Sequence, residues 1–217
     1  MALLDLEQLS VGYGLHSILR DVSLHLGSGD VVAIFGDNGS GKSTLLRCIF
    51  GLLSPSTGRI RFDGRDVTSA SILARQRAGM SYLFQGRRIF DDLTVEENLE
   101  VSLRAYSRNT LSRDALEMLG RFTTVKFDHG RKANGLSDGE AKILAFVCAI
   151  LAKPRLLLMD EPTASLSPDS ARTLLSILDE YQRQYGTTML IVDHNRNEAM
   201  QIANRAVVVA NGVVVDS

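Results

Sequence analysis

Eight residues in the first quarter of the chain restrict its fold more than any other feature of the sequence. They match the pattern G-x-x-x-x-G-K-S/T, in which glycines and backbone N–H groups surround a phosphate. The apolar run Val31 to Phe35 precedes them and predicts a buried strand, and Thr44 to Phe50 carries apolar residues at helical spacing. This order predicts a nucleoside polyphosphate site at the start of the helix. The eight residues are Gly36, Asp37, Asn38, Gly39, Ser40, Gly41, Lys42 and Ser43.

Two side chains of this loop have separate expected roles. Lys42 would reach the β- and γ-phosphates, and the Ser43 hydroxyl would bind Mg²⁺. The alternative is a chance glycine- and serine-rich turn before a helix, which the complete motif and its flanking elements disfavour. Gly51 is expected to end the helix, because glycine commonly follows a helix C-terminus.

Composition and charge exclude several classes of protein. The chain has 217 residues, 45% of them hydrophobic and 23% charged, which suits one globular domain with a good core. Its formal net charge of -1 gives no electrostatic case for nucleic acid as a partner. The first residues lack the pattern of a secretory signal, and the longest uncharged apolar run, Ile143 to Ala152, is too short to span a bilayer. We therefore expect a cytoplasmic protein that acts at a membrane only through a partner.

The pattern of apolar residues changes twice along the chain. Alternation around Val22 to Leu26 and in Arg59 to Phe62 predicts strands in the first part. From about residue 85 to 152 the pattern is helical, and a capping box opens a helix over 94–103. A second and weaker helical stretch runs from Ser112 to Leu119.

The last third of the chain returns to alternating strands and helices. Apolar runs at 155–159 and 189–192 predict two buried strands. Between them we expect a helix over 167–186, with serine and proline at its start and glycine at its end. Asn211 and Gly212 stand between two valine-rich runs and predict a hairpin.

Two carboxylates follow the buried strand expected at 155–159. Asp160 stands where a P-loop NTPase holds the carboxylate that supports Mg²⁺. Glu161 comes next and is suited to orient and deprotonate a water molecule that attacks the γ-phosphate. The alternative is that the strand simply ends at polar residues, but behind a P-loop both carboxylates favour catalysis.

Another helix start with polar residues precedes this strand. Ser137 and Glu140 form a capping box before the apolar helix expected from Ile143 to Leu151. A capped helix start is the simplest interpretation. Serine and glycine at a helix N-terminus also form an anion site, so Ser137 and Gly139 are candidate phosphate contacts.

These pieces, in this order, resemble the ATP-binding cassette (ABC) ATPases along the whole length of the chain. The pieces are Tyr13-Gly14, the P-loop, Gln85, the signature Leu136 to Glu140, Asp160-Glu161 and His194. Each is weak alone, but their order within one domain is very specific. The resemblance implies an α/β fold with a P-loop NTPase core, an N-terminal antiparallel β layer and an inserted α-helical subdomain. The implied boundaries within a single domain, 1–217, are 1–84 and 153–217 for the core with the β layer, and 85–152 for the helical signature subdomain.

The resemblance also implies roles for single residues. Tyr13 would stack on adenine, and Gln85 would contact Mg²⁺ and the attacking water, together with Ser43 and Asp160 as metal residues. His194 would contact the γ-phosphate as a switch residue. Without the resemblance, Tyr13 would be an ordinary packing residue, and Gln85 and His194 would carry no functional signal.

The resemblance further implies a dimer in which ATP joins two subunits. Gly36 to Thr44 of one subunit would face Ser137 to Glu140 of the other, with two ATP molecules held head to tail. Ala164 to Ser167 resembles the loop that crosses to the partner. Hydrolysis would open the dimer and do work on transmembrane permease subunits, which would hold the protein at the inner face of the cell membrane. The resemblance leaves open whether the pair is a homodimer or a heterodimer with a related ATPase.

One segment points to a branch of the family. Phe84 to Leu99 is similar to the glutamine-loop region of ATPases that serve hydrophobic (branched-chain) amino acid importers. A generic glutamine loop before a capped helix is the alternative, and related subunits serve other substrates such as lipopolysaccharide. A soluble ABC ATPase that acts as an assembly or regulatory module is a further hypothesis, as is an ATP-binding protein that no longer hydrolyses. Asp138 supports the last, since it replaces a glycine of the usual signature and adds negative charge near the partner's γ-phosphate.

Overall fold

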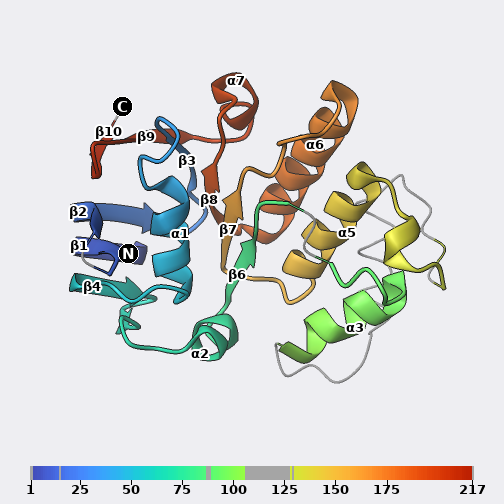
Figure 1. Cartoon of the computed structure of the whole chain (residues 1–217), viewed down its shortest axis with the longest axis horizontal. Helices are drawn as coiled ribbons and strands as arrows, with labels where there is room; N and C mark the ends of the chain where they lie inside the picture. Colours follow the sequence, from blue (N-terminus) through green and yellow to red (C-terminus); the bar gives the residue numbers. More distant parts are fainter. Residues whose placement is uncertain (1, 15, 87–88, 106–127, 129, 217) are drawn as a thin grey trace.

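A computed structural model describes residues 2–14, 16–86, 89–105, 128 and 130–216. The helix expected from Ser112 to Leu119 lies outside these residues. The described chain forms two sheets with one helix between them and further helices on the far side of the second sheet (Figure 1). Among the described residues, no helix combines the length and the apolar character that crossing a bilayer requires.

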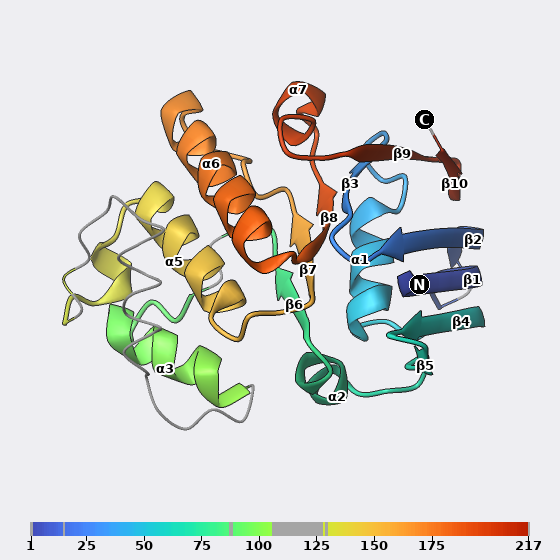
Figure 2. The same cartoon turned by 180° about the vertical axis from the view of Figure 1, so that it is seen from behind.

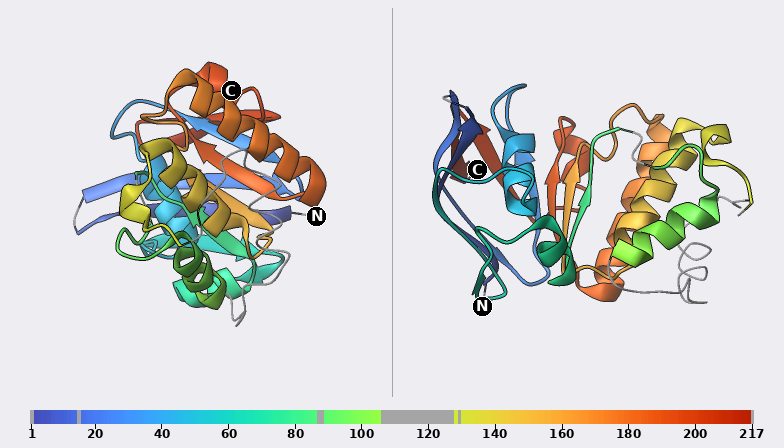
Figure 3. Two further views of the ribbon diagram at one scale, coloured as in Figure 1. Left: turned by 90° about the vertical axis from the view of Figure 1, so that its right-hand side faces the viewer. Right: turned by 60° about the horizontal axis from the view of Figure 1, so that its bottom comes forward.

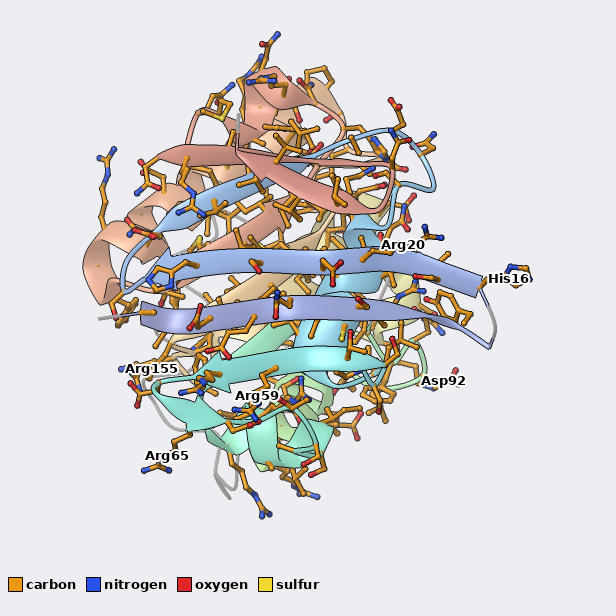
Figure 4. All side chains as sticks on the ribbon, turned by 90° about the vertical axis from the view of Figure 1, so that its left-hand side faces the viewer. His16, Arg20, Arg59, Arg65, Asp92 and Arg155 are labelled. Carbon is orange, nitrogen blue, oxygen red and sulfur yellow. The ribbon has the colours of Figure 1, made fainter. Side chains whose placement is uncertain are left out.

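The first sheet is antiparallel and has the strand order β2-β1-β4-β5. One face packs into the core and the other carries polar side chains, among them Arg59 and Arg65 (Figure 4). Arg155 reaches the end of this sheet and donates two hydrogen bonds to the Asp63 carboxylate, at 2.5 and 2.8 Å. The strands are β1 (Ala2–Tyr13), β2 (His16–Gly27), β4 (Thr57–Phe62) and β5 (Arg65–Asp66).

The second sheet is parallel except at one edge, and its strand order is β10-β9-β3-β8-β7-β6. Every residue of its central strands is buried, because both faces of the sheet are covered. The strands are β3 (Val31–Phe35), β6 (Met80–Leu83), β7 (Leu156–Asp160), β8 (Thr188–Val192), β9 (Arg205–Ala210) and β10 (Val213–Asp216).

Helices cover the two faces of the parallel sheet differently. Helix α1 lies between the two sheets, whereas α5 and α6 cover the opposite face and α3 packs against α5 (Figures 1 and 2). Alternate residues of β7 therefore enter different cores: Leu156 and Leu158 join the core around α1, and Leu157 and Met159 the core around α5 and α6. The helices are α1 (Lys42–Phe50), α2 (Ile72–Arg77), α3 (Val95–Ala105), α5 (Asp138–Ile150), α6 (Pro168–Tyr185) and α7 (Arg196–Ala199), with a 3-10 turn at Ala133–Gly135.

The fold class predicted from the sequence is confirmed. The antiparallel β layer, the P-loop core and the helices between β6 and β7 are all present. Several boundaries differ: among them, β7 begins at Leu156 instead of Arg155, α1 at Lys42 instead of Thr44, and α5 at Asp138 instead of Ile143. The short helix α2 was not predicted.

Arg75 on α2 carries a buried charge that the sequence did not indicate. Only 1% of Arg75 is exposed to solvent. Its guanidinium donates to the carbonyl oxygens of Cys48 and Ile49 at 2.8 and 2.6 Å. It also donates to Thr68 and Ala70 at 2.8 and 3.1 Å. Cys48 and Ile49 lie in the last turn of α1, where the helix dipole favours a cation. Arg75 thus fixes the far end of the helix that the glycine loop starts.

We expect Arg75→Met to lower the free energy of unfolding by about 3 kcal/mol, because it leaves buried carbonyls without their donors. Arg77→Met on the exposed side of the same helix is the matched control and should cost less than about 0.5 kcal/mol. Urea unfolding measures both variants. Equal losses from the two substitutions would contradict a structural role for the Arg75 guanidinium.

Candidate active site

The glycine loop joins β3 to α1 and requires glycine at two positions. Gly36 has φ 148° and Gly41 has φ 109°. A Cβ atom at Gly36 would lie 2.2 Å from the Val209 carbonyl oxygen, and one at Gly41 would lie 2.6 Å from Leu19 Cδ2. Gly41 precedes α1 without a side-chain cap, so the helix N-terminus and its positive dipole end face the loop. This arrangement is a ready anion site.

Lys42 lies across this loop and is 5% exposed. Its Nζ donates to the carbonyl oxygens of Gly36 and Asp37, both at 2.8 Å. Burial lowers the pKa of the Lys42 ammonium group, and the nearby carboxylates of Glu161, Asp37 and Asp160 oppose that shift. The cation is thus held in the loop by acceptors that belong to the loop itself.

The glycine loop also contains a buried polar group that is available to a ligand. The Ser40 hydroxyl oxygen is buried and has no hydrogen-bond partner among the described residues. Buried polar atoms are normally satisfied, so a partnerless hydroxyl inside a glycine loop indicates room for a ligand oxygen. The loop therefore fits a polyphosphate.

Ser43, in the first turn of α1, and Asp160, at the end of β7, bring a hydroxyl oxygen and a carboxylate together beside the glycine loop. The Ser43 hydroxyl donates to Asp160 Oδ1 at 2.9 Å, and the Tyr82 hydroxyl donates to Oδ2 at 3.1 Å. Asp160 is 2% exposed at the end of β7. Burial raises the pKa of its carboxyl group, and the hydrogen bonds from Ser43 and Tyr82 counter that rise. Hydroxyl and carboxylate oxygens are the donors that Mg²⁺ prefers, so these residues fit the metal.

The burial of Asp160 predicts a cost in stability. When folding raises the pKa of a carboxyl group, the ionised group lowers the free energy of unfolding at pH values above the ordinary pKa of that group. This loss of stability disappears when the pH falls below the ordinary pKa. We expect Asp160→Asn to stabilise the ligand-free protein by about 1 kcal/mol at pH 7, and by less at about pH 4.5. Thermal melting at both values tests this, with the exposed Asp21→Asn as the control. A lower melting temperature for Asp160→Asn at pH 7 would contradict it.

Glu161 is the centre of a second cluster. Its backbone is in the left-handed region, with φ 51°, and its N–H donates to the Val192 carbonyl at 2.8 Å. Gln85 Nε2 donates to Glu161 Oε2 at 2.6 Å, and His194 Nε2 lies 2.5 Å from Oε1. Because β6, β7 and β8 are neighbours in the parallel sheet, the residues that follow them meet at one edge. The structure thus brings together the three side chains that the sequence singled out.

The loop after Glu161 is held from two sides by residues that the sequence analysis missed. The Thr163 hydroxyl donates to Asp193 Oδ2 at 2.8 Å, and Asp193 is buried directly after β8. The Lys142 ammonium on α5 donates to the carbonyl oxygens of Pro162 and Ala164. An acidic residue after a buried strand was the available signal for Asp193, and Lys142 had none.

Tyr13 lies at the end of β1 and is 44% exposed. Arg47 on α1 donates to its hydroxyl at 3.3 Å, which fixes the ring beside the helix that begins at the glycine loop. An exposed ring held in this way is suited to stack on a nucleotide base.

Ser137 and Gly139 lie elsewhere in the chain. The Ser137 hydroxyl accepts from the Glu140 N–H at 3.3 Å, and the Glu140 carboxylate accepts from the Ser137 N–H at 2.8 Å, so α5 begins with the predicted capping box. Helices α1 and α5 lie on opposite faces of the parallel sheet (Figure 3). The structure therefore does not join the start of α5 to the glycine loop of the same chain. Asp138 instead lines a hollow of ≈ 500 Å³ together with Gln85 and Lys142.

Comparison with known proteins agrees with this geometry. The family model described as ABC transporter matches residues 19–164. The high-affinity branched-chain amino acid transport ATP-binding protein BraG of Pseudomonas aeruginosa is 33% identical over 213 residues, which are 98% of this chain and 91% of that protein. The probable branched-chain amino acid transport ATP-binding protein LivF of Archaeoglobus fulgidus is 34% identical over 207 residues, or 95% and 88% of the two chains.

Solved structures share the fold. A dimeric ATP-binding cassette in a post-hydrolysis state, bound to ADP and Pi, matches with a TM-score of 0.87 and 26% identity, over 97% of this chain and 96% of that one. Other relatives, between 29% and 34% identical, are named for ribose, sulfate/thiosulfate and methionine import. Similar identity to proteins named for different solutes means that this similarity does not select one solute.

Proposed function

The chain belongs to the ABC transporter family and is one of its ATP-binding cassette ATPases, and from this premise we propose how its own residues bind and cleave ATP. One observation carries the proposal: Glu161 lies between Gln85 and His194, and the residue before it bonds to Ser43 of the glycine loop. A base, a switch residue and a phosphate cradle therefore converge on one edge of the sheet.

In this proposal the loop from Gly36 to Thr44 holds the triphosphate. Backbone N–H groups at the start of α1 and the Ser40 hydroxyl donate to phosphate oxygens. Lys42 exchanges the carbonyl oxygens of the loop for phosphate oxygens, which are stronger acceptors because they are charged. The phosphate site is bordered by the remaining loop residues Asp37, Asn38 and Gly39. Tyr13 stacks on the adenine.

Glu161 acts as the general base. Its carboxylate orients a water molecule and accepts the proton as the water attacks the γ-phosphate. Gln85 and His194 each contact a different oxygen of the carboxylate and so limit the orientations that Glu161 can adopt. His194 responds to the γ-phosphate, and loss of that group on hydrolysis changes what the histidine contacts. Catalysis is then mainly a matter of positioning and of charge stabilisation.

The residues that would hold Mg²⁺ are Ser43, Asp160 and Gln85. When bound, the metal neutralises charge that develops on the phosphate oxygens. The chain's own contribution is a buried carboxylate at the end of a rigid strand and a hydroxyl in the first turn of α1.

We propose that two copies of the chain complete each other's sites. Helices α5 and α1 pack into cores on opposite faces of the sheet, so in this proposal Ser137 and Gly139 contact the nucleotide of the partner and not that of their own chain. A similar cassette forms a dimer with ADP and Pi, which supports this arrangement. The boundaries 1–84, 85–152 and 153–217 fit such a design, because the helical part can move relative to the core as the dimer opens.

The partner of the dimer is proposed to be a transmembrane permease at the inner face of the cell membrane. Two relatives named for branched-chain amino acid transport match nearly the whole chain, so we propose hydrophobic amino acids as the transported class. This assignment depends on those names and on the segment Phe84 to Leu99, and the ATP site itself carries no information about the solute.

Co-expression with a permease encoded beside the chain's own gene tests this function. We expect the two proteins to copurify from detergent extracts and expect Mg²⁺-dependent phosphate release to rise when a branched-chain amino acid and its binding protein are added. Purification of the chain from the soluble fraction with no permease would favour a regulatory module. Absence of phosphate release under all conditions would contradict the proposed chemistry.

A further inference from the structure

We propose that Tyr82 is a positioning residue that holds the Asp160 carboxylate in the orientation that Mg²⁺ requires. This inference rests on the proposed function of the Ser43–Asp160 pair. It concerns a residue that carried no functional signal in the sequence, since Tyr82 is one of the four buried residues of β6.

The two oxygens of Asp160 have different partners. Tyr82 on β6 is paired with Leu158 on β7, two residues before Asp160. Its hydroxyl donates to Oδ2 at 3.1 Å, whereas the Ser43 hydroxyl donates to Oδ1 at 2.9 Å. Each oxygen is therefore tied to a different structural element, and rotation of the carboxylate would break both bonds.

The direction of the Tyr82 hydrogen bond is also determined. Its acceptor is the Asp160 carboxylate, and an ionised carboxylate has no proton to donate. The Tyr82 hydroxyl is therefore the donor of this bond and Asp160 Oδ2 the acceptor.

Aromatic packing holds the ring of Tyr82 in place. Phe84 stacks on it with ring centroids 4.1 Å apart and an interplanar angle of 25°. Phe50 of α1 meets it edge-on, at a centroid distance of 5.4 Å and an angle of 75°. Tyr82 is 7% exposed, so its hydroxyl is presented at a fixed position on the carboxylate.

A fixed carboxylate matters because Mg²⁺ demands near-octahedral geometry and tolerates misplaced ligands poorly. Replacing a hydrogen-bond partner of a metal ligand commonly costs 10- to 100-fold in metal affinity. Ser43 is itself a proposed metal residue, so its bond to Asp160 changes when metal binds. The hydrogen bond from the Tyr82 hydroxyl is then the one that keeps the Asp160 carboxylate oriented.

The test compares ADP binding to wild type and to Tyr82→Phe by calorimetry, once with Mg²⁺ and once with EDTA. We expect unchanged affinity in EDTA and about a 10-fold smaller gain in affinity from Mg²⁺ in the variant. The Mg²⁺ concentration for half-maximal ATP hydrolysis should rise by a similar factor. Tyr181→Phe is the matched control, because Tyr181 is also buried and its hydroxyl donates to the Ile150 carbonyl at 3.2 Å, on the α6 side of the sheet.

Two outcomes would overturn the inference. One is an unchanged Mg²⁺ gain in Tyr82→Phe, and the other is an equal loss of affinity with and without the metal, which would indicate a packing effect. Phe84→Leu separates packing from hydrogen bonding, since it removes the stacked ring and leaves the hydroxyl. It should reduce the Mg²⁺ gain less than Tyr82→Phe does, because Phe50 still packs edge-on against the Tyr82 ring. Failure of the wild type to bind ADP at all would instead refute the proposed function.

Discussion

Glu161→Gln is expected to reduce ATP hydrolysis about 10³-fold while leaving the affinity for ATP within about twofold. The amide cannot accept the proton of the attacking water. Glutamine has nearly the size of glutamate and can still hydrogen-bond to Gln85 and His194, so the cluster around it should persist. The loss therefore falls on the chemical step. Phosphate release under single-turnover conditions and equilibrium binding of ATP measure the two quantities separately.

Glu180→Gln is the control for that experiment, because it makes the same change of charge at an exposed position of α6. It should hydrolyse ATP at the wild-type rate. Full turnover by Glu161→Gln would remove Glu161 from the role of base, and a parallel loss of ATP affinity would show that the carboxylate serves binding instead.

Lys42→Ala is expected to weaken ATP and ADP binding about 1000-fold, which corresponds to about 4 kcal/mol. The Lys42 ammonium is desolvated inside the loop, so its charge is poorly screened and its bonds to phosphate oxygens are strong. Calorimetric titration with either nucleotide measures the loss, and thermal melting of the ligand-free variant checks the fold. The exposed Lys132→Ala should bind normally. Undiminished affinity in Lys42→Ala would refute the assignment of the loop.

Local patterns in the sequence predicted the parts of the site that depend on neighbouring residues. The glycine loop, the capping box at Ser137 and the two carboxylates at the end of β7 are each defined within a few positions. The turn at Asn211 and Gly212 follows the same logic, since both residues have the positive φ of a tight hairpin. These elements were correct because short-range sterics and hydrogen bonding determine them.

Contacts between distant segments could not be predicted in this way. Tyr82 and Asp160 are 78 positions apart and meet only because β6 is the neighbour of β7 in the sheet. Arg75 enters the core because four carbonyls from α1 and its surroundings converge on it, and nothing in its local sequence indicates them. Lys142 contacts the loop after Glu161 from a helix of the other core face. Contacts of this kind depend on the order of the strands in the sheet, and the periodicity of apolar residues does not reveal that order.

The separation of the glycine loop from the start of α5 has a mechanical consequence. A site that needs both parts can close only when two chains meet, so closure of the site over ATP and association of the two chains are one event. In the proposed dimer, hydrolysis would weaken the contact between the chains, and the resulting opening is the movement that a permease partner would use.

The central claim is that ATP joins two copies of this chain, and light scattering of Glu161→Gln tests it most directly. With saturating Mg²⁺ and ATP the mass should rise from 23.7 kDa to twice that value, whereas with ADP it should not change. Ser137→Arg, added to Glu161→Gln, should prevent the increase and leave ATP binding intact. A mass that stays at one chain while ATP is bound would contradict the account.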